Sequence, residues 1–117
     1  MGYIHIERPD SADGRRVLIP LDEWQRAVAA TPGVRLAVGD EIRPSRFAKG
    51  GEIRIHNSGG NAETFFPKES SWRVVFRWSR GRVSFGVVPQ TSPVWQAARS
   101  LAGELHAKLV GDEGAQY

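Results

Sequence analysis

The sequence predicts an α+β domain in which two helices pack on one face of an antiparallel sheet of about four to six strands. Short stretches in which polar and apolar residues alternate, such as Tyr3–Glu7, recur along the chain and are typical of strands. Two stretches, 21–30 and 92–107, instead repeat apolar residues at helical spacing. No internal repeat or linker divides the 117 residues, so we expect a single domain over 1–117.

The chain begins with a strand and a loop. Tyr3–Glu7 alternates and is followed by turn-forming residues over 8–14. Residues 17–19 are apolar and can return beside the first strand. An Asp13-Gly14 turn would set a different register, so the pairing stays open.

The first helix is predicted over 21–30. Leu21, Trp24 and Val28 recur at helical spacing, and Thr31–Gly33 contains the proline and glycine that end the helix. We expect Trp24 to anchor the core.

The middle of the chain contains glycine-rich breaks between short strands. We expect a short strand over 34–38 and a mobile basic loop over 39–51. Residues 52–56 alternate again, and the turn 57–61 leads to another strand over 62–66, which predicts a hairpin.

The stretch WRVVFRWSRGRVSFGVV, residues 72–88, predicts a second hairpin with Arg80-Gly81 at its turn. This register pairs Trp78 with Val83 and Phe76 with Phe85, so that the aromatic side chains share one face. The opposite face is expected to carry Arg73, Val75 and Arg77.

The last helix is predicted over 92–107, with Ser92 as its N-cap and Pro93 at its first position. A short strand over 108–110 and an acidic end follow.

The composition excludes several kinds of site. The chain has no cysteine, so disulfides, thiolate metal sites and cysteine nucleophiles are absent. The N-terminal residues lack the pattern of a secretory signal, and no apolar run approaches the length of a membrane span. We expect a cytoplasmic protein with no membrane partner.

Charge is distributed unevenly. The net charge of the chain is +3, whereas residues 43–82 hold nine basic and three acidic residues, a net of +6. Such a polarised surface favours an anionic or acidic partner. Because arginine binds phosphates and carboxylates alike, this chemistry does not separate nucleic acid from an acidic protein. The candidate partner-binding residues are Arg43, Arg46, Lys49, Arg54, Arg73 and Arg77.

Other candidate chemistry is weaker. His5 and Glu7 share a strand face and, with His56 or His106, have the ligand types of a two-histidine, one-carboxylate iron site. Surface or cross-strand histidines are the simpler interpretation. The glycine-rich turn 57–61 lacks the lysine and spacing of a P-loop. We therefore expect no catalytic residue, no metal and no cofactor.

The ending ARSLAGELHAKLVGDEGAQY, with IPLDEWQRAV and FRWSRGRVSF, resembles a group of small uncharacterised bacterial proteins. Members of that group share an alanine- and leucine-rich helix, a short apolar strand, a Gly-Asp-Glu-Gly segment and a tyrosine near the C-terminus. The resemblance implies a bacterial, stand-alone protein and carries no functional residue.

A stable fold with a charged surface and no recognisable active site predicts a non-enzymatic interaction protein. The leading hypothesis is an immunity or antitoxin-like partner that binds an acidic protein surface. The alternative is an RNA- or DNA-binding module in which the same arginines contact phosphates.

Overall fold

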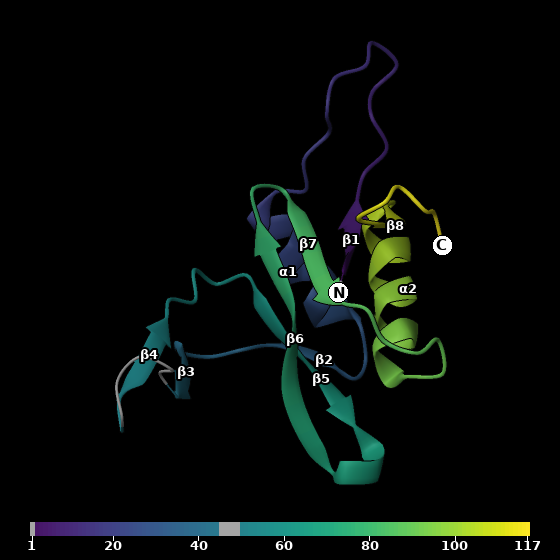
Figure 1. Ribbon diagram of the computed structural model, residues 1–117. Coiled ribbons are helices and arrows are strands. Elements are labelled where there is room, and N and C mark those ends of the chain that lie inside the picture. Colours follow the sequence, from purple (N-terminus) through teal and green to yellow (C-terminus); the bar gives the residue numbers. More distant parts are fainter. Residues whose placement is uncertain (1, 45–49) are drawn as a thin grey trace.

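The computed structural model describes residues 2–44 and 50–117, which form a six-stranded sheet, a separate two-stranded sheet and two α-helices (Figure 1). This arrangement confirms the α+β class. The helices are α1 (Leu21–Ala30) and α2 (Pro93–Leu105), with a short 3₁₀ helix η1 (Pro67–Glu69). The strands are β1 (Tyr3–Glu7), β2 (Val34–Leu36), β3 (Glu41–Pro44), β4 (Glu52–Ile55), β5 (Asn61–Phe66), β6 (Ser71–Ser79), β7 (Arg82–Gly86) and β8 (Lys108–Gly111).

The large sheet has the strand order β2-β5-β6-β7-β1-β8, and all of its neighbouring strands are antiparallel. Both helices pack on one of its faces, where the apolar sides of the strands and helices meet. Of the helices that the structure describes, neither is long and apolar enough to cross a membrane.

Four aromatic rings form a continuous row through the core. Trp24 of α1 meets Phe76 edge-on, Phe76 meets Phe85, and Phe85 meets Trp95 of α2, with ring centroids 5.4 to 6.1 Å apart. These edge-to-face contacts are the favoured geometry for aromatic pairs. The row joins both helices to the centre of the sheet and confirms Trp24 as a core anchor.

Three tryptophans also tie loops to the core through their indole N–H groups. Trp24 donates to the Gly60 carbonyl over 2.9 Å, and Trp78 donates to the Ile19 carbonyl over 2.8 Å. Trp95 donates to the Val88 carbonyl over 2.7 Å. Each bond satisfies a backbone acceptor that lies outside the helices and strands.

The β6–β7 hairpin confirms the predicted turn. Arg80 and Gly81 both have positive φ, 52° and 84°, as a type I′ turn requires. Ser79 then pairs with Arg82, and Trp78 pairs with Val83. The predicted helices, the first strand and the strand after α2 are confirmed as well, and the Ser92 hydroxyl caps α2 by accepting from the Val94 N–H.

Residues 17–19 do not return beside the first strand, a pairing that the sequence left open. β1 pairs with β7 and β8 instead, and the residues before α1 form no strand. Ile19 is fully buried, and its N–H donates to the Gly81 carbonyl, so this segment passes over the β6–β7 turn. Its apolar residues contribute to the core without sheet pairing.

The hairpin predicted between 52–56 and 62–66 is wrong. β4 pairs with β3, and the two strands make a ribbon that lies beside the main body (Figure 1). β5 pairs with β2 and β6. The predicted basic loop over 39–51 therefore contains a strand, β3.

Candidate interaction surface

The face of the large sheet opposite the helices is covered by no described helix. Because side chains alternate across a strand, Ile4 and Ile6 point into the core and His5 points to this outer face. Cross-strand pairing then places a mixed set of side chains on the outer face: Arg35, Glu63, Phe65, Trp72, Val74, Arg77, Arg82, Ser84, His5 and Glu7.

A β-bulge in β6 decides which arginines share this face. Ala62 pairs with Phe76, whereas the next residue, Glu63, pairs with Val74, so Val75 is the extra residue. Arg77 lies on the outer face, and Arg73 pairs with Thr64, whose side chain is on the helix side. The prediction that Arg73 and Arg77 share a face is wrong, because the bulge shifts the alternation by one residue.

The same bulge brings aromatic residues to the outer face. Trp72 pairs with Phe65, and their ring centroids are 5.4 Å apart. The Arg35 guanidinium lies 4.1 Å from the centroid of the Trp72 ring, a cation–π contact. In contrast to the other three tryptophans, Trp72 makes no hydrogen bond through its indole N–H within the described residues.

Each arginine of the outer face has an acidic neighbour. Arg35 pairs with Glu63 over 2.9 Å and Arg82 with Glu7 over 3.9 Å, both within the sheet. Arg77 donates to Glu41 of β3 over 2.7 Å, which also joins the ribbon to the sheet. The outer face is therefore balanced in charge, and its aromatic pair, Phe65 and Trp72, lies near the end of the β5–β6 hairpin.

The other predicted binding residues do not join Arg77. Arg54 lies in β4 and faces Asp40 over 3.7 Å, with most of its side chain exposed. Arg73 pairs with Glu69 and lies over the Phe66 ring. Arg43 pairs with Ile53 along the ribbon, while Arg46 and Lys49 lie outside the described residues.

Asp40 fixes the base of the ribbon. Its carboxylate accepts from the Asn57 backbone N–H over 3.0 Å, and this bond is the main cause that lowers the pKa of Asp40. The charges of His56 and Arg54 act in the same direction. Asn57 adds side-chain bonds to the Ala37 and Gly39 carbonyls, so the two ends of the ribbon are tied together.

A serine, a histidine and an aspartate form a hydrogen-bonded chain at the β1 end of the outer face. His5 Nδ1 lies 2.8 Å from Ser84 Oγ, and His5 Nε2 lies 2.6 Å from Asp112 Oδ1. Asp112 also accepts from the Tyr3 N–H over 2.7 Å, so the chain fastens the turn after β8 onto β1. Because the three residues lie in β1, in β7 and in the turn after β8, we interpret the hydrogen-bonded chain as a structural clamp that joins these segments.

The histidines and Glu7 do not assemble into the iron site considered from the sequence. Both nitrogens of the His5 ring face protein partners, His56 lies beside Asp40, and His106 ends α2 with a left-handed backbone. Within residues 2–44 and 50–117, no three histidine or carboxylate side chains are grouped as metal ligands.

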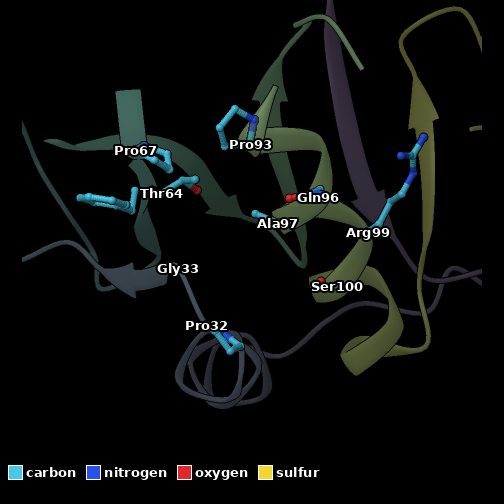
Figure 2. Close-up of a pocket in the computed structure, with 10 residues that line it drawn as sticks. Pro32, Gly33, Thr64, Pro67, Pro93, Gln96, Ala97, Arg99 and Ser100 are labelled. Carbon is cyan, nitrogen blue, oxygen red and sulfur yellow. The ribbon is translucent and has the colours of Figure 1, made fainter. Parts of the chain in front are cut away.

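A hollow of about 570 Å³ lies on the other side of the sheet, between α2, β5 and the turn after α1 (Figure 2). Three prolines, Pro32, Pro67 and Pro93, line it together with Ala97. Among the described residues that line it, Arg99 alone is titratable; its guanidinium lies over the Trp95 ring and points away from the hollow.

No protein family, curated protein or solved structure matches the chain. The outer face is therefore identified as a candidate interaction surface from its geometry alone. Sequence reasoning placed Arg77 there but missed Trp72, Phe65 and Arg35. The one available signal was the adjacent pair Val74-Val75, which interrupts the spacing of the arginines at the position where the bulge forms.

Proposed function

We propose that this chain is a small non-enzymatic interaction protein that binds another protein through the outer face of its sheet. An immunity or antitoxin-like partner of an effector protein is the leading form of this proposal. The observation that carries it is Trp72, a half-buried tryptophan on an uncovered sheet face, with an arginine stacked on it and its N–H unbonded within the described chain.

Tryptophan and arginine are the residues that most often dominate protein–protein binding energy, especially near the centre of an interface. Trp72 is such a residue, with the Phe65 ring beside it and the Arg35 guanidinium stacked on its own ring. A partner that covers this cluster would remove apolar ring surface from water and could accept the free indole hydrogen. The ion-paired arginines elsewhere on the face, Arg77 and Arg82, suit a polar rim.

The charge balance of the face favours a protein partner over a polyanion. Binding to nucleic acid draws its affinity mainly from unpaired basic groups that neutralise phosphates. Here the arginines at positions 35, 77 and 82 already face carboxylates, so a polyanion would have to displace those acids. A partner with mixed charges can exchange ion pairs without that cost.

The proposal is tested by photo-crosslinking from the outer face in native cells. A photo-reactive amino acid at Val74 should capture one protein that survives nuclease treatment. The same group at Val38, which is 98% exposed and lies in the loop between β2 and β3, should not. With the captured protein purified, Trp72→Ala should weaken binding by roughly 30-fold, as a hot-spot residue does. Trp72→Phe, which retains a stacking ring, should weaken it less.

Thermal unfolding of each variant separates a lost contact from a lost fold. If Trp72→Ala folds normally and binds the captured protein as tightly as the wild type, the outer face is not the contact surface. Capture at Val38 alone would likewise place the binding site elsewhere.

Single-stranded nucleic acid is the second candidate, favoured by the Phe65–Trp72 pair with Arg35 above it. Aromatic side chains on an open sheet face are the stacking platforms of many RNA-binding domains. Recovery that disappears after nuclease treatment, with affinity falling linearly against the logarithm of salt concentration, would support this function instead.

A further inference from the structure

We infer that the β3–β4 ribbon is a self-association element, through which β4 pairs antiparallel with β4 of a second copy of this chain. The result is a four-stranded intermolecular sheet. The inference concerns the ribbon and is independent of the function proposed for the outer face of the large sheet.

The first observation is an open strand edge. The ribbon contains two strands, so β4 has β3 on one side and no other described strand on the second side. Unpaired backbone groups along an edge are a template for a further strand, and an isolated two-stranded sheet is marginal in stability. β3 is the poorer edge because Pro44 cannot donate a hydrogen bond.

The second observation is apolar exposure. All four residues of β4 are exposed, including Ile53 at 43% and Ile55 at 37%. Ile42 of β3 is 53% exposed as well. Natural edge strands usually carry features that prevent pairing, such as proline or charges of one sign. β4 lacks proline, has β-branched residues on an open edge, and carries two charges of opposite sign, Glu52 and Arg54.

The third observation is that β4 is complementary to itself. In an antiparallel pair with a two-fold axis at Ile53, Glu52 lies opposite Arg54 of the second copy, and Arg54 lies opposite Glu52. The two Ile53 side chains become neighbours. Opposite charges directly across a strand pair are stabilising, and like charges are destabilising.

Other registers lose this match. A two-fold axis at Arg54 would place the two Arg54 side chains opposite each other. An axis between Ile53 and Arg54 would pair charged residues with isoleucines. Glu52 is available for the new contact, because it makes no ion pair within the described part of the chain, and Arg54 faces Asp40 only over 3.7 Å.

A contact of about five residues a side is much smaller than the roughly 1,600 Å² of a standard stable interface. We therefore expect a weak dimer that forms and dissociates with concentration. Sedimentation of the full chain over a series of concentrations up to about 1 mM should show the average mass rising from one chain toward two.

Charge variants test the register. Glu52→Arg places two arginines opposite two arginines, and Arg54→Glu places glutamates opposite glutamates, so each variant alone should dimerise at least tenfold more weakly than the wild type. An equimolar mixture of the two restores every opposite-charge pair and should form a mixed dimer. The double variant with Glu52→Arg and Arg54→Glu should also regain dimerisation.

The mixture shows in addition that both single variants still form the ribbon. A wild-type chain that stays monomeric over the whole series would overturn the inference. It would also be overturned by single variants that dimerise as tightly as the wild type, or by a mixture that gains nothing over its components, since either result would place the contact elsewhere.

Discussion

At the scale of single residues, Gly60 joins helix α1 to strand β6 through its carbonyl oxygen. Its carbonyl accepts from the Trp24 indole and from the Trp78 backbone N–H, and the glycine itself is buried. A Cβ at this position would lie 2.7 Å from the Trp78 Cβ and 3.2 Å from its carbonyl oxygen. The backbone therefore approaches β6 more closely than any side chain would permit.

Gly60→Ala should lower the free energy of unfolding by about 1 to 3 kcal/mol, because the added methyl group forces the turn away from Trp78. Gly86→Ala is the matched control: a Cβ there meets nothing within 4 Å and the backbone has no positive φ, so the change should be neutral or slightly stabilising. Urea unfolding measures both, and equal effects would contradict the close approach.

At the scale of elements, the turn after β8 is held by hydrogen bonds to the Asp112 carboxylate. The His5 side chain first, and then the Tyr3 backbone N–H, lower the pKa of Asp112 from its ordinary value of 3.8. A carboxyl group whose pKa falls on folding adds stability above its unfolded pKa, and this stability is lost as the pH falls through the folded value.

Asp112→Asn should therefore be less stable than the wild type near neutral pH, and the difference should shrink as the pH falls below about 4. Urea midpoints measured at several pH values test this expectation. Glu113→Gln, the change of the neighbouring acid, has no described hydrogen bond to lose and should show no such convergence. If the stability difference between the wild type and Asp112→Asn is constant with pH, the ionised carboxylate does not contribute to holding the turn.

The elements that sequence reasoning predicted correctly are those with local signals. Periodic apolar residues and a capping serine determine the helices, and the Arg80-Gly81 turn determines its hairpin. The failures concern partners far along the chain. Whether 17–19 pairs with β1, or β4 with β5, depends on other strands that can pair with the same edge. A short stretch of sequence does not contain the information that decides between these pairings.

The candidate site was less predictable for a related reason. Arg77 could be placed because the turn sets its register, and the bulge at Val75 then moved Arg73 to the helix side and Trp72 to the outer face. One extra residue reverses every side chain beyond it. The position of such a residue depends on packing between β5 and β6, which the sequence of β6 alone does not contain.

At the scale of the whole molecule, stability should be unevenly distributed. β1 and β7 lie inside the large sheet and carry core side chains, whereas the ribbon is joined to the body by the Arg77–Glu41 pair and the bonds of Asn57 and Asp40. Two-stranded sheets without a core open locally at low cost.

In hydrogen exchange at low protein concentration, amides of β3 and β4 should exchange at least about 100-fold faster than those of β1 and β7. Raising the protein concentration should slow exchange in β4 and leave β1 unchanged. Ribbon amides as well protected as those of β1 at every concentration would mean that the ribbon opens only with the whole domain.

The place of β1 in the sheet also has a consequence for synthesis on the ribosome. β1 is made first, yet its two neighbours, β7 and β8, are made much later, with 74 residues between Glu7 and Arg82. At 5 to 20 residues per second, β1 waits about 4 to 15 s for its first partner. The nascent chain must carry an unpaired strand with apolar side chains during that interval, and the large sheet can close only after β7 and β8 have been made.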